Sequence, residues 1–444
     1  MAKEKARLKP KSGLSKPALS PVAGKGHAPK RPSNTNGDDT AAGRGGSGEG
    51  AIVPQAVSRV TSFEQMTLRE DVLRGLFAYG YERPSRVQSQ ALPAILSGRD
   101  VLAQAQSGTG KTSMTAIAAV QAVRASSSEL QVLILSPTRE LATQTHDVIT
   151  NIGQFVRGLR SQCAVGGGSG SSSKKGQGQS KRSVNSYAGV QIVSATPGRA
   201  CDLLARGTLT VRKVRLLLVD EADEMMTRGL QERLYDIYRA LDSRSQIVLV
   251  SATMPADVLA MTDAFTTEPL RILVARDALT LEGIRQFYVD VGTEQWKLDA
   301  LCDLYERITV GQCVVFVNSR KKCEWLARQL QALGFGVGVL HGDMVQRDRD
   351  EVMRTFRAGA SRVLIATDVC SRGIDVQQLS LVLNFDLPRD PESYLHRIGR
   401  SGRFGRRGMA ISLVTSEERA QLRTLETFFS IRIPAMPSDT LDVL

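Results

Sequence analysis

The clearest chemical signal in the sequence is a glycine-rich run that ends in a lysine and a threonine. Residues 105–112 read AQSGTGKT, after a short apolar run and before a stretch that favours helix. Successive backbone N–H groups in such a loop, with the N-terminus of the next helix, can surround phosphate groups. Lys111 would reach the terminal phosphates and the Thr112 hydroxyl would bind Mg²⁺. Gly108 and Gly110 allow close approach of the backbone, so the spacing predicts a nucleoside triphosphate site.

Two acidic residues follow a second apolar run. Residues 214–223 read VRLLLVDEAD, which places Asp220 and Glu221 at the carboxyl end of an expected buried strand. Ligands of open parallel sheets bind at this edge. Asp220 is suited to hold Mg²⁺, directly or through water, because Mg²⁺ prefers oxygen ligands. Glu221 is suited to orient the attacking water and to accept its proton.

An arginine-rich run, HRIGRSGRFGRRG, occupies residues 396–408. Guanidinium groups bind phosphates through paired hydrogen bonds. Some of these arginines could stabilise the charge on a transferring phosphoryl group, and a basic face for nucleic acid is an equal interpretation of the run by itself. Delivery of an arginine from this second half of the chain would make hydrolysis conditional on closure of two units. The arginines are Arg397, Arg400, Arg403, Arg406 and Arg407.

Short apolar runs alternate with amphipathic segments from residue 63 onward, and they predict the elements that position these residues. Continuous apolar strands between helices are typical of a parallel sheet covered on both faces. We expect two such α/β units, with a boundary near 268–279. The first has expected strands at 100–103, 132–136, 191–194, 216–219 and 246–251, with a helix at 141–152. The second has expected strands at 313–318, 336–340, 363–366, 379–385 and 408–414.

Composition restricts the class of protein. The chain has 444 residues, of which 42% are hydrophobic, so several domains can each form a packed core. The formal charge of +13 favours polyanionic partners such as nucleic acid. The six cysteines lack CxxC spacing, which argues against a zinc site and favours a reducing compartment. The apolar runs are too short to span a membrane, so we expect no membrane association.

Two segments stand apart by their composition. Residues 1–57 are rich in Gly, Pro, Ser, Ala and Lys and predict a disordered basic tail. The tail could be a solubilising extension, a nuclear import signal or an auxiliary arm for nucleic acid. Residues 166–183 read GGGSGSSSKKGQGQSKRS and predict a flexible surface loop. This loop is either a tolerated insertion or a basic segment that touches a phosphate backbone.

Together these motifs resemble the DEAD-box family of ATP-dependent RNA helicases, and closely its translation initiation factor 4A subgroup, with the exon-junction and ribosome-assembly relatives. The tetrapeptide at 220–223 is the one that names the family, and the resemblance runs from about Thr61 to Leu444. It implies two tandem RecA-like domains, at 58–268 and 279–444, joined by a linker at 269–278. One departure is the loop at 166–183, which replaces a shorter and more acidic helix-forming stretch of the family.

The resemblance also implies roles in ATP binding and catalysis. Phe63 would stack on the adenine and Gln88 would hydrogen-bond its edge. Arg397 and Arg400 would reach the γ-phosphate from the second domain, and His396 would bridge the γ-phosphate region and the first domain. Thr112 and Asp220 would hold Mg²⁺. The implied nucleotide-binding set is Phe63, Arg83, Gln88, Ser107, Gly108, Thr109, Gly110, Lys111, Thr112, Ser113, Asp375, Arg397 and Arg400. The implied catalytic set is Lys111, Asp220, Glu221, His396, Arg397 and Arg400.

Further matching positions imply contacts with RNA, mostly with phosphates and ribose hydroxyls, which carry little sequence information. Ser251 and Thr253 would couple hydrolysis to unwinding. In the first domain the RNA contacts would be Pro137, Thr138, Arg139, Gly167, Thr196, Gly198 and Arg199. In the second domain they would be Asn318, Arg320, Gln346, Arg349, Thr367, Arg372 and Gly373.

The function that we expect is an RNA-dependent ATPase that clamps RNA, separates short duplexes or remodels ribonucleoprotein. The alternative is an ATP-locked RNA clamp that serves as an assembly platform with little unwinding of its own. A DNA helicase is disfavoured by the RNA-type motifs. The expected ligands are ATP, Mg²⁺ and RNA without sequence preference, and the expected protein partner is a scaffold that bridges both domains of a chain that is monomeric alone. The basic tail favours the nucleus, and the resemblance to a translation factor favours the cytoplasm.

Overall fold

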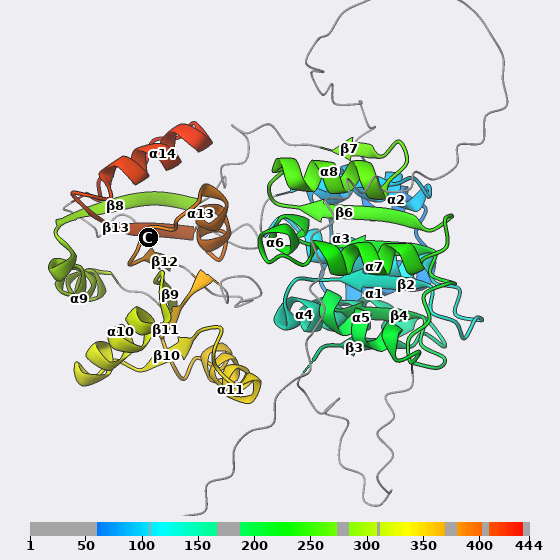
Figure 1. Cartoon of the computed structure of the whole chain (residues 1–444), viewed down its shortest axis with the longest axis horizontal. Helices are drawn as coiled ribbons and strands as arrows, with labels where there is room; N and C mark the ends of the chain where they lie inside the picture. Colours follow the sequence, from blue (N-terminus) through cyan, green and yellow to red (C-terminus); the bar gives the residue numbers. More distant parts are fainter. Residues whose placement is uncertain are drawn as a thin grey trace, which may run out of the picture. The chain divides into compact units, whose positions relative to one another are not determined.

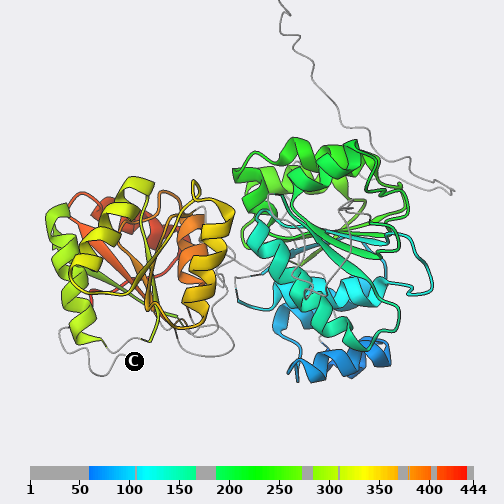
Figure 2. The same cartoon turned by 90° about the horizontal axis from the view of Figure 1, so that it is seen from below.

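The computed structural model describes residues 60–105, 108–166, 187–272, 284–308, 311–368, 379, 381–401 and 408–437. In this part of the chain the strands form two parallel sheets, each with helices on both faces (Figures 1 and 2). The expected α/β class with two units is therefore confirmed. We call the parts that carry the two sheets the first and the second domain. The expected tail at 1–57, and the expected loop at 166–183 beyond Gly166, lie outside the described residues.

The first sheet has the strand order β3-β4-β2-β5-β6-β1-β7. Every residue of β1, β2, β4 and β5 is buried, as expected for strands covered on both faces. The five strands predicted here are present, with ends displaced by one residue at most. The strands are β1 (Val101–Gln104), β2 (Val132–Leu135), β3 (Ser161–Ala164), β4 (Ile192–Ala195), β5 (Leu216–Val219), β6 (Gln246–Ser251) and β7 (Leu270–Ile272).

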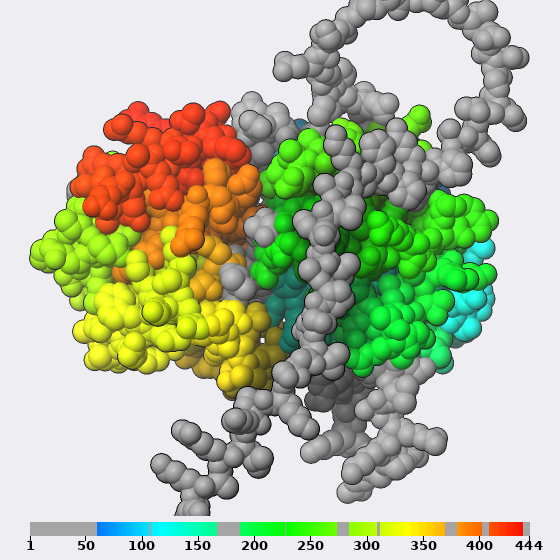
Figure 3. Space-filling view, viewed as in Figure 1, coloured from blue at the N-terminus to red at the C-terminus, as the bar shows by residue number. Residues whose placement is uncertain are grey.

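Two groups of helices cover this sheet. Val101 and Ala103 of β1 face one group, and Leu102 faces the other, because successive strand residues point to opposite faces. The first group is η1 (Phe63–Met66), α1 (Glu70–Ala78), α2 (Arg86–Leu96), α3 (Lys111–Ala122), α4 (Arg139–Ile152) and η2 (Gly153–Phe155). The second group is α5 (Pro197–Ala205), α6 (Ala222–Thr227), α7 (Gln231–Ala240) and α8 (Ala256–Phe265). Side chains coloured green form the surface over the second group in Figure 3.

The second sheet has the order β10-β11-β9-β12-β13-β8. Its strands are β8 (Ile284–Gly292), β9 (Cys313–Phe316), β10 (Val337–Leu340), β11 (Val363–Ala366), β12 (Leu381–Asn384) and β13 (Gly408–Thr415). One face packs against α9 (Lys297–Arg307), which follows η4 (Glu294–Trp296), and α10 (Arg320–Ala332). The other face packs against α11 (Gln346–Arg357), α13 (Pro391–Ile398) and α14 (Arg419–Phe429). The predicted strands are again present, with ends displaced by two residues at most.

Three edge strands were not predicted, namely β3, β7 and β8. β7 pairs with β1 through Val101 and Leu270, so the linker predicted at 269–278 starts too early. Edge strands are short or partly exposed, and β3 and β8 consist mostly of half-buried residues, so neither carries a continuous apolar run.

Within the described residues, no helix combines the length and the apolar composition needed to cross a bilayer.

Candidate active site

The carboxyl edge of the first sheet brings three sequence motifs together. β6 lies between β5 and β1, so the residues that follow these strands are neighbours at one edge. The glycine-rich loop follows β1, the acidic pair follows β5, and Ser251 is the last residue of β6. Ligands of open parallel sheets bind at this edge. The fold therefore assembles motifs that are far apart in sequence into one candidate nucleotide site.

The glycine-rich loop enters α3 through two glycines in the left-handed region. Gly108 has φ +80° and Gly110 has φ +95°, a conformation that other residues rarely adopt. A Cβ atom at Gly110 would lie only 2.7 Å from Nε2 of Gln88. Because α3 begins at Lys111, its first unpaired N–H groups lie at this loop. Of the other predicted loop residues, Thr109 and Thr112 are half-buried and Ser113 is buried, whereas Ser107 lies outside the described residues.

Gln88 ties the start of α2 to this loop. Its Oε1 accepts a hydrogen bond from the Ser85 N–H at 2.8 Å. Its Nε2 donates to the Gly110 carbonyl oxygen at 3.2 Å and to Ser113 Oγ at 2.8 Å. The buried amide therefore fixes the position of the loop. The predicted contact with adenine stays a prediction beside this positioning role.

Lys111 carries the observation that best fits a phosphate ligand. Its side chain is buried, and its Nζ has no hydrogen-bond partner among the described residues. A buried ammonium group without an acceptor is costly, so its expected partner is an anion. A triphosphate held by the loop would supply that anion, and the residues present therefore fit ATP.

Asp220 and Glu221 form the acidic part of the site. Asp220 is 1% exposed, and its Oδ1 accepts a hydrogen bond from the Glu221 N–H at 3.0 Å. Burial, followed by the charge of Glu221, raises the pKa of Asp220 to about 7, and Lys111 opposes this rise. A nearby divalent cation would favour the ionised carboxylate, so the pair fits Mg²⁺. Glu221 has φ +51°, and such strained residues cluster at functional sites.

Asp223 connects the acidic motif with the predicted coupling residues. Its Oδ2 accepts hydrogen bonds from the Thr253 N–H at 3.1 Å and from Thr253 Oγ1 at 2.7 Å. Ser251 Oγ accepts from the Asp223 N–H at 3.2 Å and donates to the Thr253 carbonyl at 2.7 Å. His396 Nε2 of the second domain lies 3.3 Å from the same Asp223 Oδ2. The Asp223 carboxylate thus contacts Thr253 and His396, and its backbone N–H contacts Ser251.

The predicted RNA residues of the first domain lie at the same edge, on other strands. Pro137 and Thr138 follow β2, and Thr138 Oγ1 caps α4 by accepting from the Leu141 N–H at 3.2 Å. Thr196, Gly198 and Arg199 follow β4, at the start of α5. Since the sheet order is β4-β2-β5-β6-β1, the RNA candidates and the nucleotide candidates occupy adjoining halves of one edge. Gly167 lies outside the described residues.

In the second domain the RNA candidates and the nucleotide candidates also follow different strands. The RNA candidates follow three strands that are neighbours in the sheet, β10, β11 and β9. Gln346 and Arg349 lie in the helix after β10, Thr367 follows β11, and Asn318 and Arg320 follow β9. His396, Arg397 and Arg400 instead lie between β12 and β13. Arg372, Gly373 and Asp375 lie outside the described residues, as do Arg403, Arg406 and Arg407.

Two of these side chains also contact α4 of the first domain. Arg349 Nη2 lies 2.9 Å from Glu140 Oε1, and Arg139 Nη1 donates to Gln346 Oε1 at 3.2 Å. Arg320 pairs with Asp343 of its own domain. The predicted RNA residues on α4 and α11 are therefore direct neighbours.

Arg397, which the sequence predicts to reach the γ-phosphate, has all its described partners in the second domain. The side chain is completely buried, and its guanidinium binds Asp368 through two hydrogen bonds of 2.5 and 2.6 Å. It also donates to Asn318 Oδ1 and to the Asp386 carbonyl, both at 2.7 Å. These bonds position Asn318 and Asp368, and the contact of Arg397 with the γ-phosphate stays a prediction.

Three other predicted residues differ in accessibility. Phe63 is completely buried in the apolar core of the first domain, so an adenine could stack on it only after neighbouring side chains had moved. Arg83 is exposed. Arg400 is 4% exposed, and its Nε donates to the His396 carbonyl at 3.1 Å.

The sequence analysis missed a buried charge network that supports the second domain. Lys297 is fully buried, with its Nζ 3.0 Å from carboxylate oxygens of Glu294 and Glu418 and 3.5 Å from Asp386. Asp386 in turn accepts from the Asn318 N–H at 2.8 Å. Glu294 is three residues before Lys297, but Asp386 and Glu418 lie in distant segments, so no local pattern identifies these two partners.

Family models match both domains of the chain. Residues 85–261 match the model described as DEAD/DEAH box helicase. Residues 296–405 match the model described as helicase conserved C-terminal domain. The two matched ranges contain Gln88, Lys111 and the acidic motif in the first, and His396 with Arg400 in the second.

Curated relatives and solved structures are similar over most of the chain. "Eukaryotic initiation factor 4A-III homolog B" of Oryza sativa subsp. japonica is 50% identical over 87% of this chain and 94% of its own. "ATP-dependent RNA helicase fal1" of Schizosaccharomyces pombe is 50% identical over 87% of this chain and 96% of its own. The structure of S. cerevisiae Dbp5 bound to RNA and ADP BeF3 has a TM-score of 0.79 and 34% identity, over 86% of this chain and 97% of that chain.

Proposed function

The chain belongs to the DEAD-box family of ATP-dependent RNA helicases, and from this premise we propose which residues perform each step. Its two α/β units are the tandem RecA-like domains of that family. We propose that ATP binds at the carboxyl ends of β1, β5 and β6. RNA would bind at the carboxyl ends of β2 and β4 in the first domain and of β9, β10 and β11 in the second.

Each site residue would have a separate role in the hydrolysis of ATP. The Lys111 ammonium and the N–H groups at the start of α3 would hold the phosphates. Thr112 and Asp220 would hold Mg²⁺, which supplies charge neutralisation at the β- and γ-phosphates. Glu221 would accept the proton of the water that attacks the γ-phosphorus, as the bond to the ADP oxygen breaks and ADP and phosphate form. Arg400 is the described arginine that we assign to transition-state charge.

The contacts of Asp223 carry the proposal that hydrolysis is coupled to RNA. Ser251 and Thr253 bond to Asp223, which adjoins the catalytic acids, and His396 of the second domain contacts the same carboxylate. A change at the nucleotide can therefore reach both domains through one residue.

The alternative function, an RNA clamp, uses the same residues. A clamp would show slow turnover with long retention of RNA, whereas an unwinding enzyme would separate strands rapidly.

Replacement of Glu221 tests the catalytic assignment. Glu221→Gln removes the base but keeps the size of the side chain, so we expect ATP binding to persist and turnover to fall by about 10²-fold or more. Glu232→Gln, at an exposed position of α7, is the matched control and should hydrolyse ATP normally. Binding is measured with a fluorescent ATP analogue and turnover by phosphate release. Normal turnover in Glu221→Gln would remove this residue from the mechanism.

We also propose a nuclear location, a role in mRNA metabolism, translation initiation or ribosome assembly, and a protein partner that bridges the domains. The basic composition of residues 1–57 supports the location. The similar Dbp5 has been solved with Nup159 and Gle1, which supports a protein partner. Tagged chains with and without residues 1–57 would test the location, since loss of nuclear signal is expected only in the truncated chain. Affinity purification of the Glu221→Gln chain with ATP and RNA would identify the partner.

A further inference from the structure

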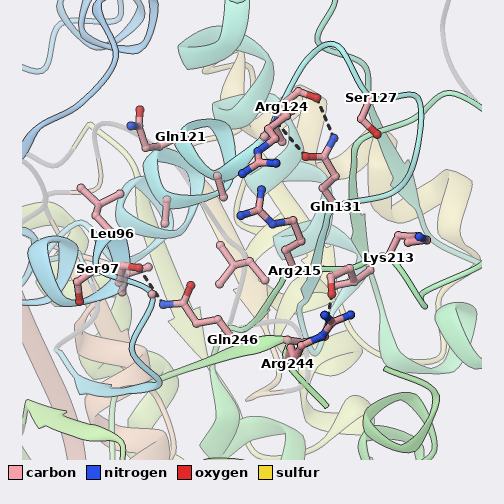
Figure 4. Close-up of a pocket in the computed structure, with 18 of the residues that line it drawn as sticks. Leu96, Ser97, Gln121, Arg124, Ser127, Gln131, Lys213, Arg215, Arg244 and Gln246 are labelled. Atoms are coloured by element: carbon pink, nitrogen blue, oxygen red, sulfur yellow. Dashed lines mark hydrogen bonds between the residues drawn. The ribbon is translucent and has the colours of Figure 1, made fainter. Parts of the chain in front are cut away.

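A second concave surface of the first domain lies at the edge of the sheet opposite the candidate active site. It is a cavity of about 1420 Å³, formed where α2 and α3 end and where β2, β5 and β6 begin (Figure 4). None of the candidate nucleotide and RNA residues is among the residues that line it. This cavity is therefore a separate feature of the molecule.

The rim of the cavity is strongly cationic. Its exposed basic residues are Arg124, Arg212, Lys213, Arg215 and Arg244, whereas its acidic residues are Glu129 and Asp242. Asp242 is bonded to Arg244. The guanidinium groups of Arg124, Arg212 and Arg215 form no hydrogen bond or ion pair with any described residue. In Figure 4 the side chains of Arg124 and Arg215 extend toward the same central part of the cavity.

Several other polar groups of the cavity already have partners within the fold. Gln131 exchanges two hydrogen bonds of 2.9 Å with the backbone of Arg124. Arg69 donates to the carbonyls of Val120 and Val123 at the end of α3. Gln246 Nε2 donates to the carbonyl of Ile95 at 2.8 Å, at the end of α2. These groups are thus satisfied internally, and Arg124, Arg212 and Arg215 of the rim remain for an anionic ligand.

The chemistry of the lining restricts that ligand. The volume exceeds the roughly 300–1,000 Å³ of small-molecule sites, so a segment of a polymer fits better than one nucleotide. No aromatic side chain occurs among the described residues that line the cavity, so stacking of unpaired bases on aromatic rings does not contribute to binding there. Double-stranded RNA is recognised through its phosphates and hydroxyl groups, with its bases stacked inside. Arginine binds phosphates in a bidentate manner.

We propose that this cavity is a second RNA site, which holds the phosphate backbone of an RNA duplex. The duplex is held by the amino edge of the first sheet while the active site acts on the adjoining strand at the carboxyl edge. The site adds affinity for substrates that contain a duplex, and it contributes nothing to recognition of sequence.

The test compares two double variants with the same loss of charge. Arg124→Gln/Arg215→Gln removes two cations of the rim, both exposed and without a described partner, so the fold should persist. Arg239→Gln/Arg423→Gln removes two exposed cations outside the cavity and is the control. Full-length chains are titrated with a fluorescent RNA duplex of about 16 base pairs and with a single strand of equal length, at several salt concentrations. ATPase stimulated by the single strand is measured in parallel.

We expect the rim variant to bind the duplex about tenfold more weakly, with a salt slope reduced by about one to two. Binding of the single strand and the ATPase stimulated by it should equal those of the control. Equal duplex binding by both variants would overturn the proposal, and so would an equal loss for duplex and single strand. Loss of an acidic protein partner with unchanged duplex binding would also overturn it, in favour of a protein interface.

Discussion

Two buried cationic side chains of this protein differ in whether the fold supplies their hydrogen-bond acceptors. The motif predicts Arg397 to be a phosphate ligand, but the side chain is completely buried, and Asp368, Asn318 and Asp386 supply its acceptors. Lys111 is also buried, yet it has no acceptor among the described residues, so we expect its partner to be a ligand. The fold therefore supplies acceptors for one buried cation and not for the other.

Arg397→Gln should therefore act on stability. Removal of the guanidinium leaves several buried acceptors without a donor, which costs on the order of 2–4 kcal/mol of unfolding free energy. Denaturant unfolding in the absence of nucleotide measures this loss. Arg320→Gln, at an exposed pair, should change the stability by less than about 1 kcal/mol. An unchanged unfolding free energy of Arg397→Gln, together with abolished ATP turnover, would instead support a role of Arg397 as a phosphate ligand.

The buried thiol of Cys313 leads us to expect a loss of folding stability at alkaline pH. Burial raises the pKa of its thiol to about 12, although the hydrogen bond with Tyr305, 2.9 Å away, opposes the rise. The folded chain then keeps a proton that the unfolded chain releases above pH 9, so stability decreases as the pH rises from about 9 to 12. Cys313→Ser removes this titration, and its unfolding free energy should fall less steeply over that range. Equal slopes for the two chains would contradict the prediction.

At the scale of elements, the nucleotide site depends on close contact between α2 and the loop before α3. Gln88 holds Gly110 and Ser113, and Gly110 has both a left-handed backbone and no space for a Cβ atom. The sequence predicted the loop from its glycines, but the contact with Gln88 depends on how α2 packs on α3. The site is thus a joint product of two elements.

Gly110→Ala tests this contact. The new Cβ would meet Gln88 Nε2 at 2.7 Å and would also strain the backbone, so we expect ATP affinity to fall by about tenfold or more. Gly207→Ala is the control, because Gly207 also has a positive φ but no atom within 4 Å of the added Cβ. It should lose about 1 kcal/mol of stability and keep its affinity for ATP. Binding is measured with a fluorescent nucleotide, and equal affinities in the two variants would exclude the contact.

At the scale of the whole molecule, one carboxylate is shared between the domains. Asp223 contacts Thr253 of the first domain and His396 of the second, so ATP and RNA can each favour the same arrangement. Such coupling is reciprocal by thermodynamic necessity. In α13, His396 contacts the first domain, whereas the Arg397 guanidinium is bonded within the second domain.

We expect RNA to tighten the binding of an ATP analogue by about 5- to 150-fold, and the analogue to tighten RNA by the same factor. Ser251→Ala/Thr253→Ala removes the two side-chain hydrogen bonds to Asp223, so this factor should approach one while each ligand still binds alone. Equilibrium titrations of each ligand at saturating concentrations of the other give both factors. Independent binding in the unmodified chain would contradict coupling through Asp223.

The sequence by itself determined the strands, the glycine-rich loop, the acidic motif and the family, because these depend on local runs and fixed spacings. The central strands are buried on both faces and therefore carry apolar runs, whereas the edge strands β3 and β8 do not and were missed. Only the tertiary structure decided the burial of Arg397, the tie between Gln88 and Gly110, the network of Lys297 and the cavity between Arg124 and Arg215. Each of these depends on which side chains of distant segments meet, and no periodicity along one segment records that.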